Sequence, residues 1–345
     1  MKRYDVFLDA GTPKHVIFAM VIQEELRRKS IKSLLIVRDE TQAIALADTL
    51  HLSYVKAGTY GGGGIREKLE ASISRMRELL EIVDEYGPPK VWWTHGEVAG
   101  VRVAFGLSIP IIYCNDTPYN TAVCKLTVPL SNYLVTPSAC GKEVWMKYGA
   151  SEENVVTYNG VEETAWVKPG VAPKTRVWGE IGLRDERVIV VRGPEYKASY
   201  YTREFPLLRL VSELASSYRV VYIPRYREEV ERFSRVPNVH VLKRVVYTPD
   251  LLGCVDLFIS SGGTMASEAA LQGTPTISYH FWTPSLRFLH DNGFPVKHIS
   301  DPMLILEESR KIMENPEKYR VDTTKLLEKL ESPIPIVTDL IERFL

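Results

Sequence analysis

Two adjacent glycines before a predicted helix are the strongest chemical signal in the sequence. An apolar stretch at 257–260 leads into a turn and then a helical pattern, through Ser261, Gly262, Gly263 and Thr264. Glycines let the backbone approach a ligand closely, and the free N–H groups of a helix start attract an anion such as a diphosphate. Glu268 follows one turn later, where its carboxylate can accept hydrogen bonds from the two hydroxyls of a ribose. The alternative is a tight turn with a solvated Glu268.

A histidine follows the first predicted strand. The segment Asp9–Val16 closes that strand and opens a helix, with Gly11 and Pro13 as turn residues. His15 would project from the first helical turn, and an imidazole with an ordinary pKa near ~6.5 can take a proton from a hydroxyl. Asp9 is a candidate to orient His15 and raise its basicity. The alternative is a histidine that caps the helix or packs beneath the loop.

Two further loops in the first half hold polar side chains after apolar runs. His95 and Glu97 follow one such run, either as an acid–base pair or as a solvated loop with a helix cap. Asn115 and Asp116 follow the next run, in the sequence Asn-Asp-Thr-Pro that is also common in turns. Because strand ends of a parallel sheet gather at one edge, either group could point at a ligand.

The second half offers an arginine at a comparable place. Arg192 ends the apolar run 188–191, where it could neutralise a phosphate or form a surface ion pair. Arg225 repeats this arrangement more weakly after Ile223 and Pro224.

The composition is that of an ordinary globular protein. The chain has 345 residues, 45% hydrophobic and 25% charged, and its length suits two domains of ~150–170 residues each. Lys+Arg and Asp+Glu are both 43, which argues against binding of nucleic acid or an anionic membrane through bulk charge. No apolar stretch reaches the ~18–20 residues of a membrane helix, and the N-terminus does not resemble a signal peptide. We expect free thiols in a reducing cytoplasm for Cys114, Cys124, Cys140 and Cys254.

Short apolar runs alternate with longer helical patterns, which predicts right-handed βαβ units and mainly parallel sheets. The expected strands are 4–8, 33–37, 91–94, 109–113 and 133–136 in a first series, and 188–191, 220–223, 239–242, 257–260 and 275–278 in a second. The Gly- and Pro-containing stretch 159–183 between them is interpreted as a linker. We predict an N-terminal domain over 1–165, a linker over 166–182, a C-terminal domain over 183–325 and a helical tail over 326–345 that could cross back to the first domain. The fold class is α/β, with two Rossmann-like doubly wound domains facing across a cleft.

Three other segments have structural interpretations. Gly61–Gly64 lacks the Gly-Lys-Ser/Thr of a phosphate-binding P-loop and is interpreted as a loop near an acceptor site. Trp92 and Trp93 are expected in the core. The charged run Arg66–Glu85 is typical of a solvated amphipathic helix.

The segment Ser261–Glu268 resembles, at the same spacing, the nucleotide-sugar signature of glycosyltransferases with the two-domain GT-B fold. It is most similar to the bacterial N-acetylglucosaminyltransferase that makes the lipid-linked peptidoglycan precursor, in which loop amides hold the donor diphosphate and the acid binds the ribose. The first loop of that family is glycine-rich and also ends in a histidine, whereas Pro13 and Lys14 replace glycines here. Non-hydrolysing UDP-N-acetylglucosamine 2-epimerases share the fold and a related Ser-Gly-Gly loop. In these folds the segment before the phosphate loop, here Val245–Asp250, contacts the base.

Over most of its length the chain resembles a mainly archaeal family of GT-B-like proteins of unassigned function. The segments that carry this resemblance are 9–15, 95–120, 191–200 and 258–278. The resemblance implies a fold rather than a reaction.

Three functions remain open. The leading hypothesis is a metal-independent glycosyltransferase with a UDP-type sugar as donor substrate and no resident cofactor. Its catalytic candidates are His15 as base with Asp9, Glu97 and Asp116, and its donor-binding candidates are Arg192, Ser261, Gly262, Gly263, Thr264 and Glu268. A 2-epimerase would use Asp9, His95, Glu97 and Asp116 as acids and bases, and a non-catalytic nucleotide-binding protein is the third alternative.

The expected partners follow from the leading hypothesis. They are a nucleotide sugar and an acceptor that is lipid-linked, a glycan or a small molecule. We expect no nucleic acid, at most peripheral membrane contact, and a cytoplasmic location. The sequence does not determine the oligomeric state.

Overall fold

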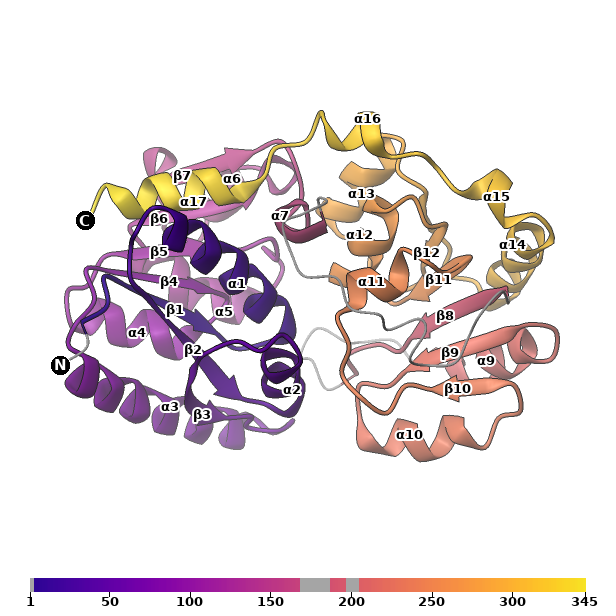
Figure 1. Cartoon of the computed structure of the whole chain (residues 1–345), viewed down its shortest axis with the longest axis horizontal. Coiled ribbons are helices and arrows are strands. Elements are labelled where there is room, and N and C mark those ends of the chain that lie inside the picture. The colour runs from indigo at the N-terminus through magenta and orange to yellow at the C-terminus, as the bar shows by residue number, and fades with distance from the viewer. Residues whose placement is uncertain (1–2, 168–186, 197–204) are drawn as a thin grey trace. The chain divides into compact units, whose positions relative to one another are not determined.

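The computed structural model describes residues 3–167, 187–196 and 205–345. The chain divides into two compact units, Met1–Ala172 with Glu331–Leu345, and Pro173–Leu330. Each unit has a parallel β-sheet between layers of helices (Figure 1). The predicted fold class of two doubly wound α/β domains is confirmed, whereas most of the predicted linker over 166–182 lies outside the described residues.

The first unit is built on a seven-stranded sheet in the order β3-β2-β1-β4-β5-β6-β7. Its strands are β1 Val6–Ala10, β2 Ser33–Asp39, β3 Val55–Thr59, β4 Val91–His95, β5 Ile111–Cys114, β6 Tyr133–Pro137 and β7 Val155–Tyr158. Its helices are α1 Pro13–Arg28, α2 Thr41–Thr49, α3 Ile65–Tyr86, α4 Val98–Gly106, α5 Thr121–Thr127, α6 Glu143–Met146, α7 Thr164–Val167 and α17 Pro333–Glu342, with 3-10 turns at Val128–Leu130, Ser138–Cys140 and Glu152–Asn154.

The core of this unit lies on both faces of the sheet, because the central strands β1 and β4 are buried along their whole length and carry apolar side chains on both faces. Trp92 and Trp93 alternate along β4, so they point to opposite faces. Trp92 packs edge-on against Phe7, and Trp93 packs edge-on against Phe18 of α1. Both tryptophans are fully buried, which confirms that they are core residues.

The second unit has a six-stranded parallel sheet in the order β10-β9-β8-β11-β12-β13. Its strands are β8 Val188–Arg192, β9 Arg219–Ile223, β10 Val239–Val241, β11 Leu257–Ser260, β12 Thr276–Ser278 and β13 Val296–His298. Its helices are α9 Leu207–Ala215, α10 Arg227–Ser234, α11 Thr248–Leu252, α12 Thr264–Leu271, α13 Pro284–Asp291, α14 Pro302–Glu314, α15 Pro316–Tyr319 and α16 Thr324–Leu327.

The strand order reverses direction once in each sheet. In the first unit the reversal lies between β1 and β4, and in the second it lies between β8 and β11. Loops after the two strands at such a point leave toward opposite faces, and the crevice between them is where open α/β sheets bind ligands. The topology therefore singles out the loops after β1 and β4, and those after β8 and β11.

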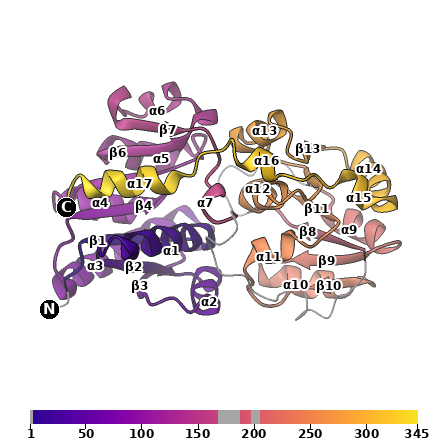
Figure 2. The ribbon, with the colours of Figure 1, turned by 45° about the horizontal axis from the view of Figure 1, so that its top comes forward.

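The C-terminal helix α17 belongs to the first unit. It packs against α1, α7, β5 and β6, and Figures 1 and 2 both show it beside α1. The backbone enters this unit at Glu331, whose N–H donates to the carbonyl of Asn159 and whose carbonyl accepts from the Thr164 hydroxyl. Val337 and Ile341 on α17 are fully buried. The last segment of the chain thus completes a core that starts at the N-terminus.

This packing predicts the effect of shortening a side chain on α17. Ile341→Ala should lower the free energy of unfolding of the first unit by about 2–5 kcal/mol, because a buried isoleucine leaves a cavity. Ile73→Ala is the matched control, since Ile73 on α3 is 50% exposed. Denaturant unfolding monitored by tryptophan fluorescence measures both. Equal, small losses for the two variants would contradict the packing of α17.

Candidate functional site

His15 lies at the reversal point of the first sheet. Thr12 caps α1 by accepting a hydrogen bond from the His15 N–H at 3.4 Å, and Pro13 occupies the first turn, where its missing N–H costs nothing. This start of α1 places the His15 ring beside the His95 ring at the end of β4, with 4.4 Å between their centroids. Two imidazoles from distant segments are therefore in contact.

Two groups lie near Nδ1 of His15. The Gly11 N–H donates to it at 3.4 Å, and Glu97 Oε1 lies 3.9 Å away. Burial lowers the pKa of His15 well below its usual range, and the charges of His95, Lys14, Arg38 and Arg75 lower it further. His15 is therefore neutral near pH 7, the state in which an imidazole can accept a proton.

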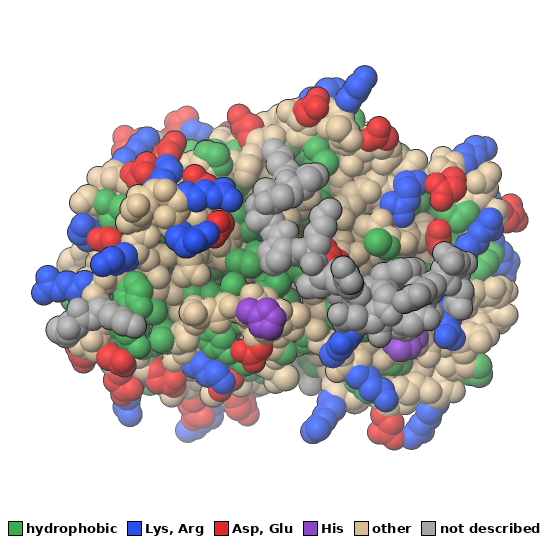
Figure 3. Space-filling view, in the orientation of Figure 1, with side chains coloured by type: hydrophobic (Ala, Val, Ile, Leu, Met, Phe, Trp, Pro, Cys, Tyr) green, Lys and Arg blue, Asp and Glu red, His purple; other side chains and the backbone are tan. Residues whose placement is uncertain are grey.

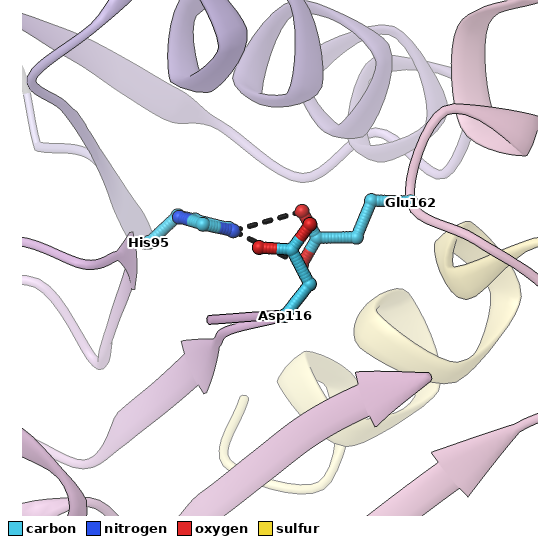
Figure 4. A group of neighbouring side chains, drawn as sticks. All are labelled: His95, Asp116 and Glu162. Atoms are coloured by element: carbon cyan, nitrogen blue, oxygen red, sulfur yellow. Dashed lines mark hydrogen bonds and ion pairs between the residues drawn. The ribbon is translucent and has the colours of Figure 1, made fainter. Parts of the chain in front are cut away.

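A cluster of ionisable side chains surrounds Lys14, next to this pair. The Lys14 ammonium lies 2.6 Å from Asp116 Oδ2, 2.6 Å from Glu162 Oε2 and 3.5 Å from Glu163 Oε1. Glu162 in turn accepts from His95 Nε2, at 2.8 and 3.0 Å for its two oxygens. Figure 4 shows His95, Asp116 and Glu162 converging from different segments of the chain. We call Lys14, His95, Asp116, Glu162 and Glu163 the lysine cluster.

Burial and the single ammonium separate the pKa values of the acids in this cluster. Burial alone would raise the pKa of Asp116, but the Lys14 and His95 charges lower it to about 2. Burial raises the pKa of Glu163 to about 8, because Lys14 lies farther away and Asp116 and Glu162 repel a further negative charge. Burial opposes the charge on Lys14, yet the three carboxyl groups hold its pKa well above the usual range. Asp116 is thus an anion at neutral pH, and Glu163 retains its proton.

His95, Asp116 and Glu162 each offer a ligand atom within 4.8 Å of the others, a spacing that divalent cations can bridge. The Lys14 ammonium already contacts both carboxylates of that group, however. Lys14 thus supplies a positive charge beside these two acids.

Asp9 belongs to a separate buried network. Its carboxylate forms an ion pair with Arg75 of α3, whose Nη1 donates to the Ala57 carbonyl. Arg75 Nε also lies 3.7 Å from Glu97 Oε2, and Arg38 lies 3.6 Å from Glu97 Oε1. Burial raises the pKa of Asp9 to about 6, with Arg75 opposing the rise and Glu97 adding to it. Asp9 therefore pairs with Arg75 rather than orienting His15, and the acid beside His15 is Glu97.

The glycine turn of the second unit follows β11, at the reversal point of that sheet. Gly262 and Gly263 have φ of +117° and +84°, which side chains rarely adopt. A Cβ on Gly262 would lie 2.7 Å from the Phe281 carbonyl, whereas a Cβ on Gly263 would meet no heavy atom of the described residues within 4 Å. Gly263 is the N-cap of α12 and makes no side-chain capping bond. The Gly262 N–H donates to Ser260 Oγ at 3.2 Å, so the main-chain N–H groups of Gly263 and Thr264 are the ones that lie beside this space for an anion.

The two side chains predicted to flank this turn are buried. Glu268 is 1% exposed, and its Oε2 accepts from the Thr248 hydroxyl at 2.6 Å. Arg192 pairs in register with Ser260, and its Nη1 donates to the carbonyls of Ile223 and Pro224 at 3.3 and 2.5 Å. Burial and the nearby Arg225 lower the pKa of Arg192 to about 9. Ser261, 4% exposed, holds the turn by accepting from the Phe281 N–H at 2.8 Å.

For four residues of the lysine cluster and the Asp9 network, the sequence analysis did not predict the position or the contacts that the structure shows. Glu162 and Glu163 fell in the stretch taken for a linker, although Val155–Tyr158 before them is a β-prone run that could have been recognised. Arg75 sits in the run taken for a solvated helix, yet it is 2% exposed. Lys14 was expected to supply charge to an acceptor diphosphate in place of a glycine, whereas in the structure its ammonium lies among the three acids. Gly64, by contrast, ends the glycine loop as the N-cap of α3.

Three further features of the described residues concern membrane-spanning helices, surface charge and cysteines. None of the described helices is long and apolar enough to cross a membrane. Acidic and basic side chains are interspersed on the face that Figure 3 shows. All four cysteines lie in the described residues as free thiols.

Two parallel-sheet units of this kind define the GT-B-like class of folds, and solved structures of that class match the chain. A UDP-GlcNAc 2-epimerase of Methanocaldococcus jannaschii in complex with UDP-GlcNAc and UDP has a TM-score of 0.72 at 16% identity, over 99% of this chain and 100% of that one. The spinosyn rhamnosyltransferase SpnG has a TM-score of 0.62 at 15% identity, over 97% and 99% of the two chains. At these identities the likeness shows the fold alone.

The family model described as "Protein of unknown function (DUF354)" matches residues 4–343, so the chain belongs to that family. A relative, the uncharacterised protein MJ0665 of Methanocaldococcus jannaschii, is 28% identical over 285 residues, which cover 81% of this chain and 82% of the relative. The resemblance to a mainly archaeal, GT-B-like family without an assigned reaction is confirmed.

Because Glu163 keeps its proton in the folded chain, we predict that the free energy of unfolding depends on pH. A folded-state pKa of about 8 exceeds the ordinary value of about 4.3, so the folded chain binds more protons in this window and stability falls as pH rises through it. Glu163→Gln cannot ionise. Its free energy of unfolding relative to the unmodified chain should therefore rise by at least about 1 kcal/mol between pH 5 and pH 8.5.

Urea unfolding at the two pH values measures this difference. Glu153→Gln, at an exposed position, is the matched control and should give the same difference from the unmodified chain at both pH values. A Glu163→Gln difference that stays constant or falls with pH would show that Glu163 is ionised in the folded chain.

Proposed function

We propose that the protein is an enzyme that acts on a UDP-type nucleotide sugar and transfers its sugar to an acceptor. The observation that carries this proposal is the uncapped start of α12 behind Gly263, with open space above it at the reversal point of the second sheet. Main-chain donors at this place suit a diphosphate, which is both the handle and the leaving group of a nucleotide sugar. Glu268 would share its carboxylate between Thr248 and the ribose.

In this proposal the first unit handles the proton of the acceptor hydroxyl. His15 is the base, and its neutral state at pH 7 suits that role. The Glu97 carboxylate, 3.9 Å from Nδ1, would stabilise the imidazolium that forms when His15 takes the proton. Glu97 is then the positioning residue for His15, and the anionic Asp116 is an acceptor for sugar hydroxyls. Asp9 supports the site through Arg75.

The charge on the departing diphosphate would be met by the N–H groups of Gly263 and Thr264 and by Arg192. These groups are fixed by the fold before the substrate arrives, which is the condition for strong electrostatic stabilisation. The proposal requires neither a resident metal nor another cofactor, and UDP remains a product.

A second candidate is 2-epimerisation of a UDP-sugar, which removes and restores a proton on a sugar carbon. The contact between His15 and His95, with Glu97 and Asp116 close by, favours it, since such a reaction needs both an acid and a base at one carbon. Both candidates use the same glycine turn.

The glycine turn predicts a binding defect. UDP at 100 times its dissociation constant should stabilise the chain by roughly 2.7 kcal/mol, which a thermal shift detects. Gly263→Ala should abolish most of this shift, because the methyl group strains the turn and fills the open space. Gly293→Ala is the matched control in the same unit, with a φ of +87° and the same local strain. An unchanged UDP shift in Gly263→Ala would refute the phosphate site.

Product analysis separates the two reactions. With UDP-N-acetylglucosamine alone in D2O, a transferase gives at most slow release of UDP, whereas a 2-epimerase yields the epimer with deuterium at C2. His15→Asn should lower the rate of either reaction by about 10²–10⁴-fold. His240→Asn, on β10 of the second unit, should leave it unchanged. A His15→Asn variant of full activity would remove His15 from the reaction.

A further inference from the structure

We propose that His95, anchored by Glu162, is a positioning residue that keeps His15 unprotonated, so that the two imidazoles share a single positive charge. This inference rests on the proposed function only for its catalytic consequence. The charge coupling itself is a property of the folded chain and can be measured without a substrate.

The geometry fixes His95 more firmly than His15. Both oxygens of Glu162 lie within 3.0 Å of His95 Nε2, and Glu162 is 1% exposed. The Lys14 ammonium also lies 2.6 Å from Oε2 of this carboxylate. The His95 ring thus has a fixed orientation, with its Nε2 proton directed at an acid. His15 is held less tightly, since its Nδ1 accepts from the Gly11 N–H at 3.4 Å and lies 3.9 Å from Glu97 Oε1.

The acid beside His95 determines which ring takes a positive charge. A carboxylate in hydrogen-bond contact stabilises an imidazolium, and Glu162 provides that contact to His95. Two imidazolium rings with centroids 4.4 Å apart in a buried site repel each other strongly. A charge on His95 therefore disfavours protonation of His15.

Other charges around the pair act in the same direction or are already compensated. Lys14 on α1, Arg38 on β2 and Arg75 on α3 all oppose a positive charge on His15. Glu97 favours one, but it lies 3.9 Å from the ring and also faces Arg38 and Arg75. Asp9 is paired with Arg75. On the His95 side, Asp116 faces both Lys14 and His95, where it adds to the effect of Glu162, and Glu163 faces Lys14.

The consequence for catalysis concerns the direction of proton flow. The proton of an acceptor hydroxyl can move to His15 only if His15 has a free lone pair, and His95 maintains that state. As the hydroxyl proton reaches His15, His95 passes its Nε2 proton to the Glu162 carboxylate that it contacts, so that only one of the two rings is charged at a time. The His95–Glu162 pair therefore sets the pH at which His15 works, without itself touching the substrate.

The experiment follows the His15 titration by NMR in the full chain with labelled histidine. His95→Gln is the main variant, because the glutamine amide can still donate to Glu162 but cannot become charged. It should raise the pKa of His15 by about 1 unit or more. Glu162→Gln, which removes the charge that favours an imidazolium at His95, should shift the His15 pKa in the same direction. The titration of His240 is the internal control and should not move.

Each outcome decides the proposal. A His15 pKa that is unchanged in His95→Gln would show that burial alone sets it and would overturn the coupling. If His95→Gln does not fold, Glu162→Gln decides by the same measurement, and an unchanged pKa there overturns the proposal.

The activity arm tests the catalytic consequence separately. The acid limb of the pH profile of kcat/KM should move upward in His95→Gln by the same amount as the NMR pKa. NMR coupling in a chain that turns over no nucleotide sugar would support this inference and refute the proposed function.

Discussion

The contacts of the Lys14 ammonium with three carboxyl groups are the interactions on which the first unit depends. Three carboxyl groups lie around it, two of them buried almost completely, and buried charges of one sign are strongly destabilising unless a partner lies close. Lys14 comes from the first turn of α1, Asp116 follows β5, and Glu162 follows β7. One cation thus ties the start of the chain to two later strand ends. Because Glu162 also holds His95, the same ammonium fixes an imidazole that it does not touch.

The two units use their sheet reversal points in different ways. In the first unit, the crevice between β1 and β4 is filled by side chains whose charges depend on one another. In the second, the space after β11 is lined by main-chain groups of a glycine turn, and the nearby Arg192 and Glu268 are held by Ile223, Pro224 and Thr248. The first arrangement suits proton transfer, since coupled burial moves pKa values apart. The second suits a diphosphate, since amide dipoles fixed by the backbone need no reorganisation.

Local patterns sufficed for most of the fold. The runs at 33–37, 91–94 and 257–260 are apolar except for one serine or threonine at an end, and each lies in a strand of the structure. The strands β3, β7 and β13 were missed because they are short or mixed with polar residues, and only pairing with a neighbour makes them strands. Glu162, Glu163 and Arg75 could not be predicted for a related reason. Their burial depends on partners 46–149 positions away in the sequence (Asp116, Lys14 and Asp9), and a local hydrophobic period carries no information about such a distant pairing.

This difference determines what decides the function. A glycine turn consists of a few consecutive residues, so it could be recognised from the sequence alone. Sugar transfer and 2-epimerisation both break the bond between the sugar and the diphosphate, and the turn would serve either reaction equally. They differ in the proton that is moved, from an acceptor hydroxyl in one case and from a sugar carbon in the other. The choice between them therefore lies with His15, His95 and the lysine cluster, whose protonation states are set by long-range packing in the first unit.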